Sequence, residues 1–186
     1  MIRPIYTYGQ PILRNANQTV EADYPHLKAL VSDMFDTMHQ AEGIGLAAPQ
    51  IGLSIRLFVI DADSLSDKYP ECANFKRVMI NPEILESSKE TVSFEEGCLS
   101  FPGIHEKVIR AEKIRIKYVD EDFNAHEEYL DGFAARVVLH EIEHLEGHVF
   151  IDTISPIRKQ LIKSKLNSLI KGKTTCKYKI NPFQSK

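Results

Sequence analysis

Two histidines four residues apart are the first residues in this sequence that could do chemistry. They bound the segment HEIEH (140–144), and a helix places His140 and His144 on one face, where two imidazoles can bind one metal ion. Glu141 projects from the adjacent flank and could reach a water on that metal without binding the ion itself. An exposed, charged helix turn is the alternative, but the flanking residues are mostly apolar, and buried polar groups need partners. The pattern therefore predicts a metal site.

A catalytic metal site needs a third protein ligand and an open fourth position. The donors just downstream of His144 lack the longer spacing that many metalloproteases use. The better candidate is Cys98 in the segment EGCLS (96–100), because a thiolate is a strong ligand for Zn²⁺ or Fe²⁺ and Gly97 allows a tight backbone. A cysteine considered alone is more often a buried structural thiol than a metal ligand. The presence of the HEIEH segment makes the metal-ligand interpretation the favoured one.

A third segment, GIGLAAPQ (43–50), contains the dinucleotide-binding pattern GxGxxA. Such a site requires a preceding strand and a following helix. Here a helix is expected before the segment, and Pro49 and a strand near Ile55 follow it, so we reject a dinucleotide site. The small residues instead indicate backbone brought close to a ligand or a metal-site wall, with Gln50 supplying an amide donor. A helix C-cap followed by a tightly packed loop is the alternative.

Three helices are expected to position these residues. Apolar residues at helical spacing, with stop signals after them, predict the ranges 24–40, 132–146 and 155–172. Asp23 and Asp131 are the candidate N-caps of the first two helices. The second helix is mostly apolar, which places it at the centre of the fold.

Short runs of β-branched and aromatic residues predict strands between the helices. Their ranges are 55–61, 77–81, 90–94, 113–119 and 126–130. Ile114, Ile116 and Tyr118 alternate with charged residues, so one face of that strand should be buried. The stretch 63–76 is expected to be a surface loop. We therefore expect an α+β fold, with antiparallel β-sheets around a central buried metal-binding helix and with a C-terminal helix.

Length and composition suit one domain spanning residues 1–186. The chain has 186 residues, of which 26% are charged and 43% are hydrophobic, and these values argue against a disordered or fibrous protein. No stretch approaches the ~18 apolar residues of a membrane-crossing helix, and the N-terminal sequence lacks the apolar run of a secretory signal. Three scattered cysteines are too few for a disulfide framework. We therefore expect a cytoplasmic protein.

The three segments, in this order and at similar separations, resemble the peptide deformylase family, which is marked by GxGxAAxQ, EGCLS and HExDH. The likeness extends from residue 9 through residue 152. The resemblance implies an α+β fold and a hydrolase that removes the N-formyl group from the N-terminal formylmethionine of newly synthesised polypeptides, releasing formate. It also implies Fe²⁺ as the metal, with Zn²⁺, Ni²⁺ or Co²⁺ able to substitute. The donor types alone do not separate zinc from iron.

By the same resemblance, the matching residues take the family's catalytic roles. The implied metal ligands are Cys98, His140 and His144. Glu141 would be the acid and base. Gln50 and the backbone N–H of Leu99 would form the oxyanion hole.

The resemblance also implies which residues surround the substrate. Backbone pairing with the peptide falls to Ile44 and Gly45, and the candidates for the wall of the methionine pocket are Phe94, Phe133 and Val137. Glu96 and Arg110 look like the family's buried ion pair beneath the cysteine segment. One departure is Glu143, where the family usually has Asp. The extra methylene leaves the ligands unchanged but alters the hydrogen bonding around them.

The C-terminal segment 156–186 is strongly basic. It carries nine Lys or Arg and no Asp or Glu, whereas the preceding 155 residues carry 14 basic and 26 acidic residues. A basic segment of this kind is typical of a surface that binds RNA or another polyanion. Members of the resembled family work on polypeptide chains leaving the ribosome. Ribosome contact through this segment is one expectation, and an ordinary solvated helix face is the other. No membrane partner is expected.

Two other functions fit part of the pattern. A general zinc endopeptidase also uses an HExxH helix, but the upstream Cys98 and the segment 43–50 argue against it. A non-catalytic protein with a structural metal would need a fourth protein ligand. Nothing near the motifs clearly supplies one, since His148, the nearest spare histidine, lies past Gly147.

Overall fold

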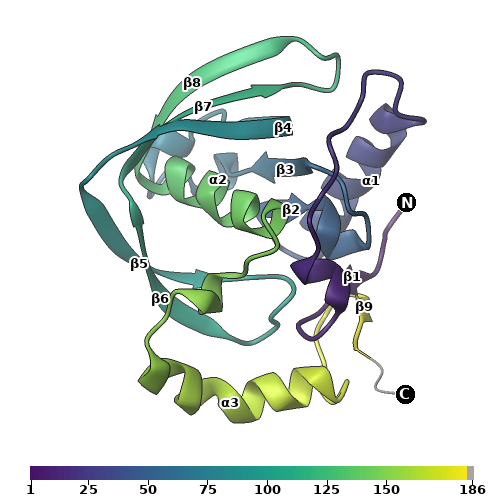
Figure 1. Cartoon of the computed structure of the whole chain (residues 1–186), viewed down its shortest axis with the longest axis vertical. Coiled ribbons are helices and arrows are strands. Elements are labelled where there is room, and N and C mark those ends of the chain that lie inside the picture. The colour runs from purple at the N-terminus through teal and green to yellow at the C-terminus, as the bar shows by residue number, and fades with distance from the viewer. Residues whose placement is uncertain (184–186) are drawn as a thin grey trace.

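The computed structural model describes residues 1–183 and places one helix, α2 (Gly132–Leu145), between a five-stranded sheet and a separate hairpin (Figure 1). The sheet has the order β2-β3-β4-β7-β8, with all neighbouring strands antiparallel. Its strands are β2 (Gly45–Ala47), β3 (Leu57–Asp61), β4 (Lys76–Ser87), β7 (Lys113–Val119) and β8 (Ala125–Asp131). The expected α+β fold, with antiparallel sheets around a buried helix, is confirmed.

The remaining elements close the fold around this centre. The hairpin pairs β5 (Thr91–Gly97) with β6 (His105–Ala111), and β1 (Ile5–Tyr6) pairs in parallel with β9 (Ile180–Asn181). The other two α-helices are α1 (Leu27–Gln40) and α3 (Pro156–Ile170), the latter running below the hairpin (Figure 1). Short 3-10 helices cover Pro11–Arg14, Ala48–Ile51, Asp63–Leu65, Pro70–Cys72 and Phe150–Asp152. None of the helices within residues 1–183 is both long and apolar enough to cross a membrane.

Burial of apolar side chains explains why α2 lies at the centre. Ala135 and Val138 of α2 are fully buried and share one hydrophobic cluster with Ile116 and Phe58 of the sheet. The alternation expected in 113–119 is confirmed, because Ile114, Ile116 and Tyr118 are all buried while their neighbours are more exposed. Burying a side chain of this size contributes about 1.5–3 kcal/mol. This face of the sheet therefore fixes the position of α2.

Several element boundaries differ from expectation, and two of the differences have clear local reasons. The first helix begins at Leu27, not at residue 24, because His26 adopts the left-handed conformation (φ 58°) and no side chain caps the helix. The strand expected to end at Asn81 continues to Ser87 through an irregularity. Asn81 is left-handed there (φ 51°), and its side-chain amide bonds both the N–H and the carbonyl of Val20 at 2.9 and 2.8 Å.

The stretch 63–76 is only partly a surface loop. Cys72 and Phe75 within it are buried, and the Glu71 carboxylate accepts a hydrogen bond from the Phe133 N–H at 2.7 Å. Asp131 occupies the N-cap position of α2, but its side chain makes no capping hydrogen bond. Glu71, which is distant in sequence, therefore caps the helix in its place.

This cap gives a testable prediction. Replacing Glu71 with Ala removes both the acceptor and the negative charge at the positive end of the α2 dipole, so it should lower the free energy of unfolding by about 1 kcal/mol. Asp131→Ala removes the same charge without a capping bond and should change stability by less than about 0.5 kcal/mol. Denaturant unfolding of both metal-free variants measures the difference. An equal or larger loss in Asp131→Ala would contradict the assignment.

Candidate metal centre

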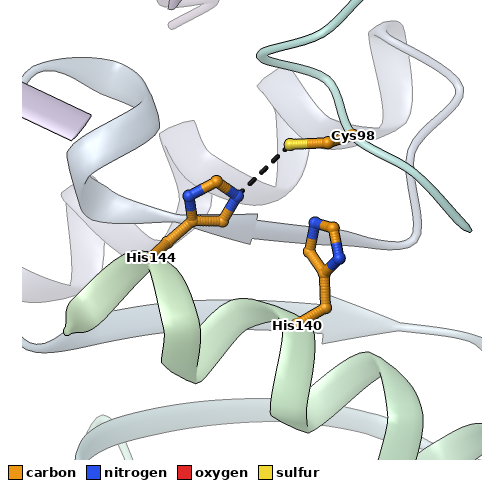
Figure 2. A group of neighbouring side chains, drawn as sticks. All are labelled: Cys98, His140 and His144. Atoms are coloured by element: carbon orange, nitrogen blue, oxygen red, sulfur yellow. Dashed lines mark hydrogen bonds between the residues drawn. The ribbon is translucent and has the colours of Figure 1, made fainter. Parts of the chain in front are cut away.

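The three predicted ligands come together although they lie on two separate elements. Cys98 directly follows β5, and His140 and His144 lie one turn apart on α2. One ligand atom from each residue lies within 4.8 Å of the other two, and the Cys98 Sγ is 3.2 Å from the His144 Nε2 (Figure 2). One sulfur and two imidazole nitrogens in this arrangement suit Zn²⁺ or Fe²⁺ and leave a fourth position without a ligand from these residues.

The hydrogen bonds of the two imidazoles also suit metal binding. His140 Nδ1 lies 2.9 Å from Glu96 Oε2, so this nitrogen carries the proton and leaves Nε2 free for an ion. Burial lowers the pKa of His144 well below its ordinary value, so that imidazole is neutral. A metal ligand must be deprotonated at the nitrogen that binds. Burial acts to lower the pKa of His140, but hydrogen bonds with Cys98 and Glu96 outweigh it and raise the pKa well above its ordinary value. His144 is therefore ready to bind, whereas an ion bound at His140 must displace a proton. The donor atoms of the three residues fit the ion.

A buried network of charges lies beneath the ligands. The Glu96 carboxylate accepts hydrogen bonds from Arg110 at 2.7 and 2.9 Å and from Arg136 at 2.5 Å, in addition to His140. Burial acts to raise the pKa of Glu96, but hydrogen bonds from His140 and Arg110 outweigh it and hold the pKa well below its usual range. Glu96 therefore stays ionised and orients the ligand His140.

The departure at Glu143 does not leave a gap in this network. Both terminal nitrogens of Arg110 donate to the Glu143 carboxylate, at 2.7 and 2.9 Å. Arg110 thus lies between the two carboxylates of Glu96 and Glu143, and the longer side chain still reaches it. Arg136 was not expected as a member, although an arginine inside an apolar helix is itself a signal that a buried anion lies nearby.

Glu141 lies in the wall of the cavity beside the ligands. Its side chain is buried, and Oε2 has no hydrogen-bond partner in the described part of the chain. Burial raises the pKa of Glu141 to about 7. A Cβ atom on Gly45 would lie 2.3 Å from Glu141 Oε1, so only glycine leaves room for this carboxylate. A group with a pKa near neutrality can both accept and deliver a proton.

Gln50 is held so that its amide nitrogen faces the loop between β5 and β6, residues 98–104, which we call the cysteine loop. The Ala47 N–H donates to Gln50 Oε1 at 2.8 Å, which fixes the orientation of the amide. Gln50 Nε2 then lies 3.4 Å from Cys98 Sγ and 3.2 Å from the buried hydroxyl of Ser100. Leu99 lies between Cys98 and Ser100 in sequence, and its side chain lies close to Gly43. Ser100 was not expected to take part.

A cavity of about 390 Å³ connects these groups. Most of the predicted site residues line it, namely Ile44, Gly45, Gln50, Cys98, Leu99, Phe133, Val137, His140 and Glu141. Phe94 is not among the lining residues but packs edge-on against Phe133, with ring centroids 6.3 Å apart. Tyr69, which was not anticipated, stacks on Phe133 at 4.3 Å. Phe94 and Tyr69 therefore support the cavity wall from behind.

The chain is similar to known proteins of one family. A family model described as polypeptide deformylase matches residues 2–160. Among curated proteins, a peptide deformylase of Flavobacterium johnsoniae is 44% identical over 97% of this chain and 95% of its own length. One from Christiangramia forsetii is 43% identical with the same coverages.

Solved structures give the same result. A peptide deformylase from Legionella pneumophila is 39% identical, with a TM-score of 0.81 over 94% of this chain and 100% of that one. One from Plasmodium falciparum is 41% identical, with a TM-score of 0.81 over 90% and 95% of the two chains.

The ligand set can be tested without any activity assay. Co²⁺ added to the metal-free protein should give a thiolate-to-cobalt charge-transfer absorption, because Cys98 binds as a thiolate. In Cys98→Ser this absorption should vanish, and the metal should bind at least about tenfold more weakly. Cys176→Ser removes a thiol away from the cluster and should keep both signals. An unchanged spectrum in Cys98→Ser would exclude the thiolate as a ligand.

Proposed function

The chain belongs to the peptide deformylase family, the metal-dependent hydrolases that remove the N-formyl group from newly made polypeptides, and from this premise we propose how its own residues perform the reaction. Cys98, His140 and His144 hold Fe²⁺, and Zn²⁺, Ni²⁺ or Co²⁺ can take its place. The clustering of these three side chains supports the ligand set. The preference for iron follows the family resemblance.

The reaction adds water across the formyl amide. When bound, the metal supplies a Lewis acid that polarises the carbonyl and lowers the pKa of water from 15.7 to about 7. Glu141 takes a proton from the attacking water and delivers it to the departing amine. A C–O bond forms, the C–N bond breaks, and the products are formate and a free α-amino group. The position of Glu141, buried in the cavity wall next to the ligand His140, is the observation that carries the proposal.

Two donors stabilise the negative charge that develops on the formyl oxygen. The amide of Gln50 is one, because the Ala47 N–H holds its oxygen and turns its nitrogen toward Cys98. The backbone N–H of Leu99 is the other. Losing one such donor costs roughly 2.7–4 kcal/mol of transition-state stabilisation in comparable sites.

The remaining cavity residues hold the substrate. The peptide backbone lies along Ile44 and Gly45, and the methionine side chain enters between Phe133 and Val137, all of which line the cavity. Phe94 acts indirectly, through its contact with Phe133. In this proposal residues 1–186 work as one catalytic domain in the cytoplasm, where new polypeptides carry the formyl group.

Glu141→Ala tests the acid and base directly. The variant should keep its metal in the wild-type ratio while formate release from formyl-Met-Ala-Ser falls by 10²–10⁴-fold, the typical value of a general acid–base group. Glu146→Ala is the matched control and should retain turnover, because Glu146 lies just past the same helix, is half-exposed and pairs with Arg56 rather than with a site residue. A Glu141→Ala protein that keeps more than about a tenth of the activity would remove the assigned role.

The basic C-terminal segment binds the ribosome in this proposal. The side chains of Lys163, Lys171 and Lys173 surround one surface hollow on α3 and the residues after it. Arg158 is already paired with Glu106 at 2.8 and 3.0 Å, which anchors α3 to β6 and leaves the lysines for a polyanion. Lys186, the last basic residue of the segment, lies outside the described residues.

Neutralising Lys163, Lys171 and Lys173 to Gln should reduce co-sedimentation with ribosomes, because a protein with fewer cations to pair with phosphates binds a polyanion more weakly. Turnover of formyl-Met-Ala-Ser should not change, because none of the three lines the catalytic cavity.

A matched variant replaces three other exposed lysines with Gln, namely Lys89, Lys113 and Lys117. The first lies between β4 and β5, and the other two lie on β7. This variant should sediment with ribosomes like the wild type. An equal reduction in both variants would indicate a nonspecific charge effect, and no reduction in either would refute docking through α3.

A further inference from the structure

The segment after α3 returns to the catalytic cavity. Its final strand β9 pairs with β1 near the N-terminus (Figure 1), with Ile180 opposite Ile5. Gln10 Nε2 donates to the carbonyls of Asn181 and Pro182, at 3.3 and 2.9 Å. Residues 180–182 are therefore fastened to the body of the protein by several independent hydrogen bonds. Tyr178 lies two residues before this fastening and lines the cavity.

The hydroxyl of Tyr178 donates a hydrogen bond of 2.7 Å to the backbone carbonyl of Leu99. The ring packs against the hydrophobic core that includes Leu46 and Met38. Burial raises the pKa of Tyr178, so the phenol keeps its proton and remains a donor at neutral pH. The family model ends at residue 160, so this contact comes from a part of the chain beyond the matched region.

Three successive carbonyls of the cysteine loop are held by three different groups. The Cys98 carbonyl accepts from the Phe101 N–H at 2.8 Å, and the Ser100 carbonyl accepts from the Tyr8 N–H at 2.9 Å. Between them, the Leu99 carbonyl has Tyr178 as its donor, and within residues 1–183 no other donor reaches it. One side-chain hydroxyl thus completes the hydrogen bonding of this turn.

We propose that Tyr178 is a positioning residue that aims the Leu99 N–H at the formyl oxygen by holding the carbonyl of the same residue. The Leu99 N–H shares one rigid peptide plane with the Cys98 carbonyl, the Leu99 carbonyl lies in the next plane, and the two backbone dihedrals of Leu99 join the planes. The Phe101 N–H holds the first plane and the Tyr178 hydroxyl holds the second, so together they fix both dihedrals of Leu99. The Leu99 N–H then keeps one direction before substrate arrives, which is the preorganisation that an oxyanion donor needs. The inference rests on the proposed role of Leu99.

A purely structural role would be to fasten the C-terminal segment. That fastening is already provided by the β1–β9 pair and by Gln10. Removing the Tyr178 hydroxyl should therefore leave the segment in place and release only the Leu99 carbonyl. The two roles predict different results at the β1–β9 pair and in the cysteine loop.

Tyr178→Phe is the test, with Tyr8→Phe as the matched control. The Tyr8 ring packs on Phe101 of the same loop, with centroids 5.1 Å apart, but its hydroxyl makes no hydrogen bond to the described residues. In Tyr178→Phe, kcat for formyl-Met-Ala-Ser should fall about five- to tenfold, the factor expected from one hydrogen bond, while KM changes less than twofold. Tyr8→Phe should match the wild type.

Amide hydrogen exchange of the metal-free protein gives a second readout that needs no turnover. In Tyr178→Phe, exchange of the Phe101 amide, which donates to the Cys98 carbonyl and closes the cysteine loop, should accelerate about five- to tenfold. Exchange of the Ile5 amide, which donates to the Lys179 carbonyl, should not change. Both the kcat loss and the faster exchange at Phe101 are required, and either one alone overturns the proposal. Faster exchange at Ile5 would show a fastening role instead. A wild-type protein that releases no formate would defeat the proposed function, whereas the exchange result judges Tyr178 separately.

Discussion

The buried carboxylate of Glu96 is the interaction on which the site depends. It lies on β5, and its partners Arg110, Arg136 and His140 lie on β6 and α2. The hairpin and the five-stranded sheet share no strand, so these bonds, rather than a β-ladder, set the hairpin against the helix. Cys98 follows Glu96 by two residues and is thereby placed over the two histidines. Breaking a buried pair of this kind by removing one partner costs about 3–5 kcal/mol, because it leaves an uncompensated charge.

The charges beneath the site balance one another. The network contains two carboxylates and two guanidinium groups, so it carries no formal net charge. These are Glu96, Glu143, Arg110 and Arg136. The electrostatic field at the metal position therefore comes chiefly from groups closer to it. The Cys98 thiolate is the anionic ligand, and Glu141 supplies a second negative charge when ionised. Charges are poorly screened in the interior of a protein. Because the charges of this network cancel, they contribute little to the electrostatic potential at the metal position.

Patterns that are local in sequence predicted much of this fold and most of the candidate site. The helical spacing of 140 and 144, and the alternation along 113–119, depend only on the period of one element, and both agree with the structure. The strand β6 was missed because its inward positions carry Glu106 and Arg110 beside Val108, which inverts the usual apolar pattern. Their partners, Arg158 and Glu96, are distant in sequence. The cap from Glu71 and the bond from Tyr178 were missed for the same reason, since no local pattern encodes a contact across the chain.

The pairing of β1 with β9 has a consequence for the order in which the molecule forms. Ile5 pairs with Ile180, so all the residues between them must be translated before this parallel pair can close. Chains fold from the N-terminus as they are synthesised, and contacts between distant residues form late because a long loop must first be closed. The hydrogen bond from Tyr178 to the cysteine loop also forms late, for the same reason. A copy of this protein that is still being synthesised can build its five-stranded sheet, its hairpin and its central helix first, and its cysteine loop acquires the restraint from Tyr178 only after that residue has been translated.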